Sequence, residues 1–406
     1  MKTILVTAYA VNPFKGSEDG MGWNFVCQIA RFNKVIAVTR ENNRPHIEKF
    51  IAAHPDEKYG NIQFLYFDLP YWMRFWKRKG QGAMLYYWMW QIAMPGFIRK
   101  TGVNFDVVHN LNFHNDWTPS YLWKLNKPMV WGPIGHHPRI PSRYLATYKS
   151  RYQQVETITW SVKNLFWKWI PSVKTTAQKA THILAMNSTV ASRFPSDAGK
   201  IQIMPSVATG DFGSGEKKTD GTFTVVSAGR LVPLKGFDLT ILAFAEFVQK
   251  LSSGDRQKCT LLIVGSGPEK DTLQNMSASL NIVDKVRFVE WMDRDLFLKE
   301  LKSASAFLFP SHEGAGMVVA EALSFGLPVL CLDNCGPGEF IDSGCGFAVP
   351  QHSVQETKSA LANALENLFF NPVLQEEMSR NARKRFETHF HWDRRGEQLQ
   401  TIYQNL

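Results

Sequence analysis

Short apolar runs alternate along the chain with longer stretches in which apolar positions recur at helical spacing. The first run, residues 4–8, precedes a glycine-rich loop at residues 12–22, a helical stretch and a second run at residues 35–39. This order of strand, loop, helix and strand predicts a βαβ unit with a parallel sheet. Further strands of the first half are predicted at residues 62–67, 106–108, 128–131 and 182–186.

A polar, glycine-rich stretch at residues 208–221 has the composition of an interdomain linker. After it, apolar runs alternate regularly with helical stretches, which predicts a doubly wound α/β domain. Its strands are predicted at residues 224–227, 260–264, 286–289, 306–309, 328–332 and 346–349. The predicted organisation is a first domain at 1–207, the linker at 208–221, a second domain at 222–390 and a final helix at 391–406.

Composition agrees with two soluble α/β domains. The chain has 406 residues, too many for one ordinary core, with 44% hydrophobic and 20% charged residues. Its formal net charge of +10 favours anionic partners such as nucleic acid, anionic lipid headgroups or phosphorylated substrates. The five cysteines form no CxxC pair with histidine support, so we interpret them as reduced cytosolic thiols.

Neither the beginning of the chain nor its longest apolar stretch indicates a membrane span. The apolar run after Met1 is too short for a signal-peptide core, and no small-residue cleavage site follows it. The longest stretch, residues 84–98, contains Gln91 and Pro95 and is shorter than the roughly 20 apolar residues that cross a bilayer. We therefore expect a cytoplasmic protein.

The most specific motif, PSHEGAGMVVAEA at residues 310–322, follows a predicted strand and opens a helix. Gly314 and Gly316 let the backbone approach a ligand closely, and the N–H groups at the positive end of the helix can hold phosphate oxygens. Glu313 can accept hydrogen bonds from sugar hydroxyls, and Glu321 can accept them from a ribose diol. The alternative is a pair of ordinary surface acids at an exposed helix start.

A second motif, AGRLVPLKG at residues 228–236, follows the first strand of the second half. Arg230 and Lys235 lie close together in this turn and can clamp a diphosphate. They would stabilise the diphosphate as a leaving group, so we predict catalytic roles for Arg230 and Lys235. We also predict a catalytic role for Glu313. The alternative is a solvated basic turn.

Together with IVGSGPE at residues 263–269, these motifs resemble family 4 of the retaining glycosyltransferases. The resemblance implies the GT-B fold, in which two Rossmann-like domains face each other across a cleft and a last helix, here at about 392–405, crosses back to the first domain. The first domain would bind the acceptor and the second the nucleotide sugar. Residues 15–18 occupy the place of the family's first glycine-rich loop, so Gly16 would face the donor phosphates.

The resemblance also implies transfer with retention of anomeric configuration, without a bound metal or other cofactor. It assigns Met317 and Val318 to the donor site beside Gly314 and Gly316, and it assigns His136 a catalytic role in contact with the transferred sugar. The sequence departs from the family at two places: Ala315 stands where Phe is frequent, and residues 135–137, Gly-His-His, stand where related sequences carry more glycine. The sugar pocket and the acceptor geometry can differ accordingly.

Three weaker patterns are given structural interpretations. Asp293-Arg294-Asp295 mimics a metal-binding DxD motif of another glycosyltransferase fold, but we expect it to cap the helix that follows. Residues 265–268 lack the third glycine of a dinucleotide fingerprint and predict a tight strand-to-helix turn. The four histidines that follow predicted strands in the first half are each expected to be structural when taken singly: His109, His114, His136 and His137.

Aromatic and basic residues are interleaved at residues 71–90, as in segments that bind membrane interfaces. The residues predicted for the membrane or acceptor side are Trp72, Arg74, Trp76, Lys77, Arg78 and Trp88. Residues 152–169 add further Trp, Phe and Lys. The alternative is an amphipathic helical layer packed on the first sheet.

The sequence thus predicts a retaining, metal-independent glycosyltransferase at the inner face of the cytoplasmic membrane. It would move a sugar from a nucleotide diphosphate sugar to a lipid-linked glycan or a glycan of lipopolysaccharide or capsule type, and nucleic acid is not an expected partner. Two alternatives stay open: a nucleotide-sugar epimerase or glycoside phosphorylase on the same fold, and a non-catalytic protein that binds membrane or nucleic-acid surfaces.

Overall fold

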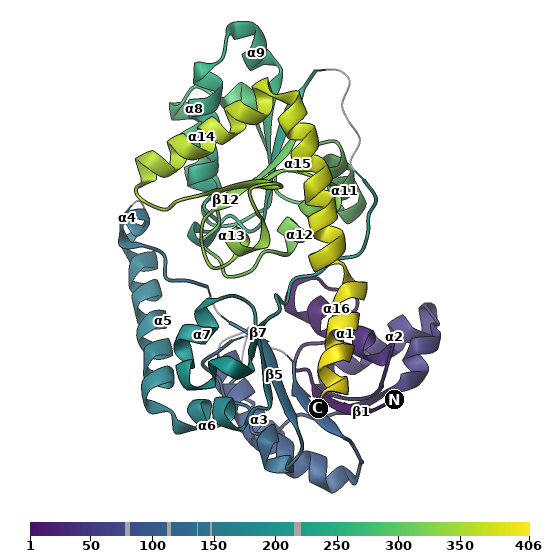
Figure 1. Cartoon of the computed structure of the whole chain (residues 1–406). Helices are drawn as coiled ribbons and strands as arrows, with labels where there is room; N and C mark the ends of the chain where they lie inside the picture. The colour runs from purple at the N-terminus through teal and green to yellow at the C-terminus, as the bar shows by residue number, and fades with distance from the viewer. Residues whose placement is uncertain (78–81, 112–114, 136, 147, 215–220) are drawn as a thin grey trace. The chain divides into compact units, whose positions relative to one another are not determined.

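The computed structural model describes residues 1–77, 82–111, 115–135, 137–146, 148–214 and 221–406 (Figure 1). The chain divides into two compact units. The first unit consists of Met1–His136, Ile158–Ser206 and Trp392–Leu406, and the second of His137–Thr157 and Val207–His391. Each unit is built on a parallel sheet of its own.

The sheet of the first unit has the strand order β3-β2-β1-β4-β5-β6-β7. Its strands are β1 (Thr3–Thr7), β2 (Lys34–Thr39), β3 (Ile62–Tyr66), β4 (Val107–Asn110), β5 (Met129–Ile134), β6 (His182–Ala185) and β7 (Ile201–Ile203). Because β1 pairs with both β2 and β4, the strand order reverses between β1 and β4. The central strands are buried on both faces, which explains why they read as continuous apolar runs.

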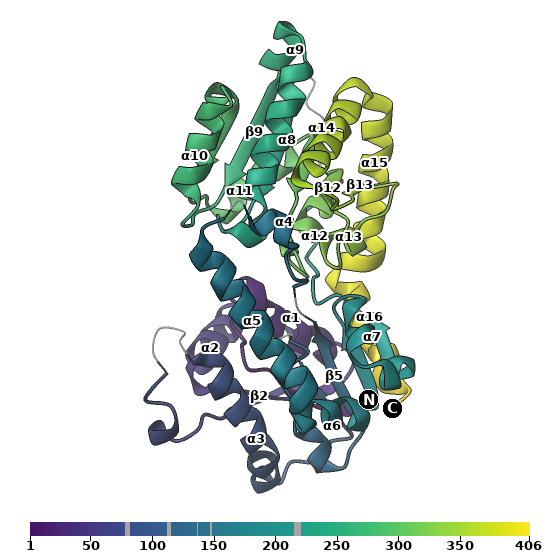
Figure 2. The same ribbon diagram turned by 90° about the vertical axis from the view of Figure 1, so that its left-hand side faces the viewer.

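Helices cover both faces of this sheet (Figure 2). They are α1 (Ser17–Ala30), α2 (Arg44–Ala53), α3 (Ala83–Thr101), most of α5 (Ser150–Trp169), α6 (Pro171–Lys179), α7 (Thr189–Arg193) and α16 (Trp392–Gln404). Short 3₁₀ turns lie at Glu41–Asn43, Glu57–Asn61, Tyr71–Met73, Leu122–Leu125 and Pro195–Lys200. Apolar side chains of α3 and α6 share a core with one face of the sheet.

The C-terminal helix α16 belongs to the first unit. Asp393 pairs with Arg31, the residue after α1, at 2.7 Å, and the Gln400 side chain accepts a hydrogen bond from Asn33 at 2.7 Å. Leu399 and Tyr403 are fully buried. These contacts fix α16 beside α1, and α16 corresponds to the last helix that the sequence predicts.

The sheet of the second unit has the strand order β10-β9-β8-β11-β12-β13. Its strands are β8 (Phe223–Ala228), β9 (Cys259–Val264), β10 (Val286–Val289), β11 (Ala306–Phe309), β12 (Val329–Leu332) and β13 (Gly346–Val349). Every described pairing is parallel.

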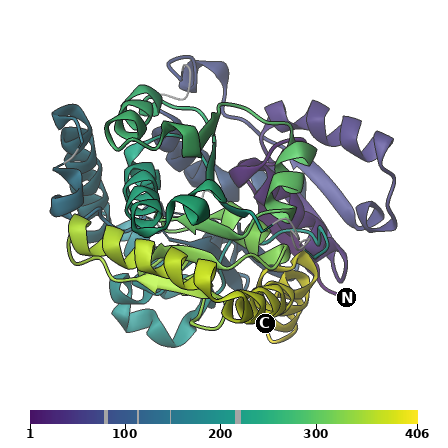
Figure 3. The same ribbon diagram turned by 90° about the horizontal axis from the view of Figure 1, so that it is seen from above.

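Helices lie around the sheet of the second unit (Figure 3), and buried side chains form two separate cores with its two faces. They are α4 (Ser142–Leu145), α8 (Phe237–Lys250), α9 (Ser253–Gln257), α10 (Lys270–Ser279), α11 (Arg294–Lys302), α12 (Met317–Ser324), α13 (Pro337–Phe340), α14 (Val354–Phe370) and α15 (Pro372–Arg385). Turns lie at Pro233–Lys235 and Val283–Lys285, and a π-helical turn at Phe386–Phe390. None of the helices in the described part of the chain has the length and apolarity that crossing a bilayer requires.

Each apolar run predicted from sequence forms a strand whose ends lie within three residues of the predicted ones. Among the described residues, the strand that the sequence did not predict is β7, Ile201–Ile203. It has only three residues, pairs with β6 at the edge of the sheet and is half exposed, so it lacks the long apolar run that marks a central strand.

The division of the chain differs from the predicted one at residues 137–157. These residues fall inside the predicted first domain, 1–207, but the structure places them in the second unit. Ile140, Tyr144 and Leu145 are buried in the core that α8 and α14 form on that unit's sheet. The predicted linker, 208–221, lies at the start of the second unit, where Thr209 is bridged to His391, and residues 215–220 of it are outside the described residues.

Candidate functional site

The candidate site lies at the carboxyl ends of β8 and β11, at the centre of the second sheet. From β8 the chain proceeds outward through β9 to β10 and then returns to β11, so the strand order reverses between β8 and β11. Loops that leave adjacent strands at such a reversal diverge, and ligands of open α/β sheets bind there. Both sequence motifs lie in these two loops.

Lys235, in the loop after β8, and Glu313, in the loop after β11, form an ion pair. Lys235 Nζ lies 2.7 Å from each carboxylate oxygen of Glu313 and 5.1 Å from the centroid of the Phe309 ring. Only 15% of the Lys235 side chain and 13% of the Glu313 side chain are exposed. Burial raises the pKa of Glu313, and the charges of Lys235 and Arg230 oppose this shift. The fold therefore joins residues from two motifs that are far apart in sequence.

The two loops are also tied together through their backbones. The His312 N–H donates to the Leu234 carbonyl at 2.9 Å, and the Ser311 hydroxyl donates to the same carbonyl at 3.1 Å. Gly236 has φ +67°, and a Cβ there would lie 2.0 Å from the Pro310 carbonyl oxygen, so only glycine fits. The position of Lys235 relative to Glu313 is thus set by the backbone.

The N-terminus of α12 opens beside Glu313. Gly316 precedes the helix without a side-chain cap, and the first turn contains no acidic residue. A Cβ at Gly316 would lie 3.2 Å from the Phe309 ring and 3.4 Å from Glu313 Oε1, which leaves no room for a larger residue without displacement. The helix that begins at Met317 and Val318 can therefore receive an anion on its backbone N–H groups.

Glu321, one turn further into α12, pairs with a residue that the sequence did not assign to the site. Arg294 Nη2 donates to Glu321 Oε1 at 2.7 Å, and Glu321 is 4% exposed. Asp293 caps α11 by accepting from the Asp295 N–H at 2.9 Å, so the predicted capping role is confirmed. No sequence signal could place Arg294 beside Glu321, because they lie on different helices.

Arg230 differs from Lys235 in its surroundings. It follows β8 through Gly229 and is exposed, whereas Lys235 is held against Glu313. Its positive charge acts on the Glu313 carboxylate. Among the described residues, no group of three or more His, Cys, Asp or Glu side chains could hold a metal ion. The two cations at the carboxyl end of β8 could interact with the negative charge of a diphosphate.

The turn at residues 265–268 packs against the Arg230 loop. It joins β9 to α10, as the sequence predicts. The Leu231 N–H donates to the Ser266 carbonyl at 2.8 Å, and the Glu269 N–H donates back to the Leu231 carbonyl at 3.2 Å. This turn therefore supports the Arg230 loop.

Residues 137–157 support both site loops, which sequence reasoning missed. The Tyr148 hydroxyl donates to Asp238 Oδ1 at 2.8 Å and contacts the Pro233 carbonyl at 3.3 Å. The Tyr144 ring packs edge-on against His312 with centroids 5.1 Å apart, and its hydroxyl lies 2.6 Å from Thr357 Oγ1. The helical spacing of the tyrosines indicated a helix face, but no strand or motif nearby indicated which unit this helix would join.

Gly16 lies in the corresponding position of the first unit, after β1 at the reversal of that sheet. It is exposed and precedes α1. In the first turn of α1, burial raises the pKa of Glu18 to about 7, and the charge of Asp19 acts in the same direction. A carboxyl with such a pKa can exchange a proton near neutral pH.

His109 has a structural role. It is fully buried, with Nε2 2.6 Å from the Gly132 carbonyl oxygen and Nδ1 2.6 Å from the Tyr403 hydroxyl. Because a carbonyl only accepts, Nε2 carries the proton and Nδ1 accepts from Tyr403. Burial lowers the pKa of His109 to about 4. His137 is exposed, while His114 and the predicted sugar contact His136 lie outside the described residues.

The aromatic and basic segment is less exposed than the sequence suggests. Trp72 is 71% exposed, but Lys77 donates to the Tyr9 hydroxyl at 2.8 Å, and burial lowers the pKa of Lys77 to about 8. Arg74 Nη1 lies 3.5 Å from Asp68. Trp76 and Trp88 are partly buried, with Trp88 Nε1 3.2 Å from the Tyr121 hydroxyl. Arg78 lies outside the described residues.

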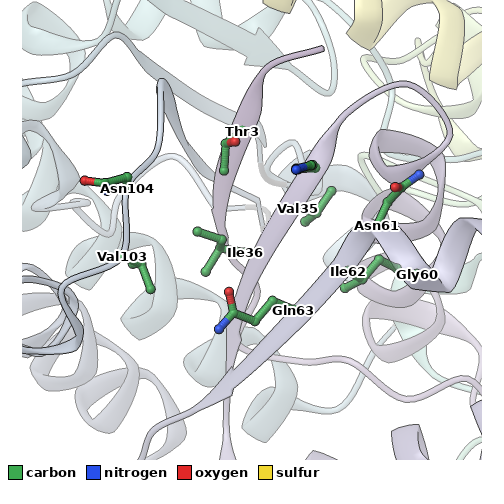
Figure 4. Close-up of a pocket in the computed structure, with 10 residues that line it drawn as sticks. Thr3, Val35, Ile36, Gly60, Asn61, Ile62, Gln63, Val103 and Asn104 are labelled. Carbon is green, nitrogen blue, oxygen red and sulfur yellow. The ribbon is translucent and has the colours of Figure 1, made fainter.

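A pocket of about 460 Å³ lies at the amino ends of the strands of the first sheet (Figure 4). It is lined by Thr3, Ile36, Asn61 and Gln63 from the beginnings of strands β1 to β3, and by Asn104 before β4. A second pocket, of about 410 Å³, lies at the amino ends of β8, β11 and β12 in the second unit. Because ligands of α/β sheets bind at carboxyl ends, neither pocket is the candidate site.

Comparison with known proteins agrees with this location. Residues 213–385 match the family model for glycosyl transferases group 1. The match lies within the second unit and includes both motifs. The match covers the part of the chain from the linker to the end of α15.

Two relatives and one solved structure show how far the similarity extends. A protein of Haemophilus influenzae described as an uncharacterized glycosyltransferase is 34% identical over 164 residues, 39% of this chain and 43% of its own. The GDP-mannose-dependent monoacylated alpha-(1-6)-phosphatidylinositol monomannoside mannosyltransferase of Corynebacterium glutamicum is 28% identical over 195 residues, 46% of this chain and 48% of its own. The matches thus span less than half of each relative.

The structure of Anabaena HepE in complex with UDP matches the whole of both chains, with a TM-score of 0.62 and 14% identity. At this identity the likeness shows the fold. The predicted α/β class, with two Rossmann-like domains of the GT-B type, is confirmed.

Proposed function

We propose that this protein is a glycosyltransferase that binds a nucleotide diphosphate sugar at the Lys235–Glu313 site. The observation that supports this most strongly is the ion pair itself, which joins the Arg230 loop to the start of α12 at the strand reversal. An exposed arginine, a lysine and an uncapped helix N-terminus lie there, and each can interact with a diphosphate.

In this proposal different residues bind the diphosphate, the sugar and the ribose of the donor. Arg230, Lys235 and the backbone N–H groups at Gly316, Met317 and Val318 hold the diphosphate. Glu313 accepts hydrogen bonds from sugar hydroxyls. Glu321, oriented by Arg294, accepts from the ribose diol. Binding of this kind requires neither a metal ion nor another cofactor, because protein cations neutralise the leaving group.

The proposed reaction retains the anomeric configuration. The bond between the sugar C1 and the diphosphate oxygen breaks, and a bond from C1 to the acceptor oxygen forms on the same face. The acceptor proton passes to a phosphate oxygen of the leaving diphosphate. Arg230 and Lys235 stabilise the negative charge that develops on that diphosphate. His136 remains the proposed contact to the transferred sugar.

The proposed acceptor is a lipid-linked glycan or a glycan of lipopolysaccharide or capsule type, reached at the cytoplasmic face of a membrane. Support comes from the mannosyltransferase relative, whose name describes a phosphatidylinositol mannoside acceptor. The net charge of +10 suits an anionic surface.

Turnover of nucleotide sugars by the purified protein tests the proposal. We would incubate UDP-glucose and GDP-mannose with a lipid-linked glycan fraction in EDTA and measure release of UDP or GDP and the new anomeric signal by NMR. The proposal predicts acceptor-dependent release and an axial linkage from an axial donor. Conversion of the donor without nucleotide release would indicate an epimerase, and phosphate-dependent cleavage of a glycan would indicate a phosphorylase.

A further inference from the structure

Positive charge is concentrated in one part of the first unit. Residues 69–135 and 158–196 together contain 13 Lys and Arg residues against two acidic residues, Asp106 and Asp116. The rest of the chain holds 33 basic and 34 acidic residues and is nearly neutral. The whole net charge of the protein therefore comes from this part, which includes α3 and α6 and the larger share of α5.

Helix α5 presents an apolar stripe to solvent in this basic part. Ile158, Val162, Leu165 and Trp169 recur at intervals of three or four residues, so they share one face of the helix. They are 63%, 41%, 51% and 73% exposed, respectively. The helix is nevertheless anchored, because Trp160 and Trp167 on its other side are buried. The exposed stripe is thus not needed to hold α5 in the fold.

Helix α3 extends this apolar surface. The rings of Trp88 on α3 and Phe166 on α5 meet with centroids 5.9 Å apart, so the two helices lie side by side (Figure 2). Leu85 and Ile92 lie three residues before and four residues after Trp88 and are 51% and 49% exposed. Val162 and Trp169 lie four residues before and three residues after Phe166 on α5. Exposed apolar side chains therefore flank the contact between the helices on both of them.

The positive charge around this apolar surface limits which partners can bind it. Exposed Lys100, Lys168, Lys174 and Lys179 lie on α3, α5 and α6. A second copy of the chain would bring like charges together, which opposes pairing of this face with itself. An anionic bilayer can bind both the exposed lysines and the exposed apolar side chains. The lysines contact its headgroups, while the apolar and Trp side chains enter the interface.

We propose that the face formed by Leu85, Ile92, Ile158, Val162, Leu165 and Trp169 docks the protein on an anionic phospholipid bilayer. The face differs from the sequence-predicted one, because Lys77, Trp76 and Trp88 are partly buried in the fold. The role of this docking rests on the proposed function, in which the acceptor is lipid-linked. Docking itself does not require the donor site.

Vesicle co-sedimentation tests this face. The probes are vesicles of phosphatidylcholine and vesicles of phosphatidylcholine mixed with phosphatidylglycerol, at low and high salt. Wild type should bind the anionic vesicles and lose affinity in high salt. Each apolar side chain that enters the interface contributes roughly tenfold, so Leu165→Ser/Trp169→Ser should weaken binding about 100-fold.

The chain offers a matched control in the second unit. Trp291 and Leu296 are 78% and 54% exposed, close to the values of Trp169 and Leu165. The variant Trp291→Ser/Leu296→Ser should bind anionic vesicles as wild type does. Titration of Leu165→Ser/Trp169→Ser with UDP and GDP should give wild-type affinities, which separates loss of docking from failure of the donor site.

Three outcomes would overturn the proposal. One is equal binding of wild type to neutral and anionic vesicles. Another is unchanged binding of the Leu165→Ser/Trp169→Ser variant. The third is a wild-type dimer in light scattering that this variant converts to a monomer, which would assign the face to a second copy of the chain.

Discussion

The substitution Glu313→Gln separates recognition of the sugar from recognition of the phosphates. It preserves the shape of the side chain and removes its charge, so the Lys235 ammonium stays largely buried without a carboxylate. Removing one partner of a buried ion pair costs about 3–5 kcal/mol. Because Lys235 is 15% exposed and the Gln oxygen can still accept one hydrogen bond, we expect about 2 kcal/mol. The melting temperature of the second unit should fall by roughly 4–8 °C.

Binding should respond differently for a nucleoside diphosphate and for its sugar conjugate. In Glu313→Gln, Lys235 no longer pairs with a carboxylate and is released toward the diphosphate, so UDP or GDP should bind as tightly as to wild type or more tightly. The corresponding nucleotide sugar should lose about tenfold or more in affinity, because a hydrogen bond to a charged group contributes roughly 1.5–3 kcal/mol. Calorimetric titration in EDTA measures both affinities.

Lys235→Met is the companion variant, and it should weaken binding of the nucleoside diphosphate and of the nucleotide sugar alike. The double variant Lys235→Met/Glu313→Gln should be more stable than the sum of the two single changes predicts, because it leaves no unpaired charge. Loss of UDP and GDP binding in Glu313→Gln with an unchanged melting temperature would refute the assignment of Glu313 to the sugar and of Lys235 to the phosphates.

Three further outcomes follow from the contacts around the site. Tyr148→Phe removes the hydrogen bond to Asp238, so the second unit should lose about 1 kcal/mol of stability in calorimetry, and unchanged stability would contradict its supporting role. Arg294→Ala leaves the buried Glu321 without its cation, and weaker nucleoside diphosphate binding is expected, whereas equal binding would exclude Glu321 from the ribose. Burial lowers the pKa of His109 and of His312 to about 4 from 6.5, so the unfolded chain binds more protons between these pH values. The free energy of unfolding should therefore fall by about 3 kcal/mol for each histidine as the pH drops through this window. The variant His109→Gln should remove the part of this pH dependence that comes from the first unit.

Sequence predicted the central strands well because parallel strands buried on both faces form continuous apolar runs. It failed for β7, whose three residues carry no such run. It also failed to assign residues 137–157, because an apolar helix face does not indicate which of two sheets it will cover. Tyr144 and Tyr148 join the second unit through contacts with residues about 90 to 210 positions away.

The site shows the same division between local and distant information. Glycines, a strand end and a helix start are local features, so Glu313, Lys235 and the α12 N-terminus could be predicted as parts of one site. The partners of charged residues are not local. Arg294 was identified only as part of a helix cap, and Lys77 was expected at the surface although it lies against Tyr9 and Tyr86. Side-chain pairing across elements depends on packing that no sequence pattern records.

Titration of Arg230→Ala with UDP and GDP in EDTA tests the donor site most directly. Arg230 is exposed, so its removal should change stability by less than about 0.5 kcal/mol. Arg380→Ala is the matched control, because Arg380 is an exposed arginine of the same unit on α15. Wild type and Arg380→Ala should bind one nucleoside diphosphate with equal affinity, and Arg230→Ala should bind it about 10- to 100-fold more weakly. Absence of binding to wild type, or equal binding by all three proteins, would contradict the assignment of a nucleotide-sugar site to the Lys235–Glu313 region.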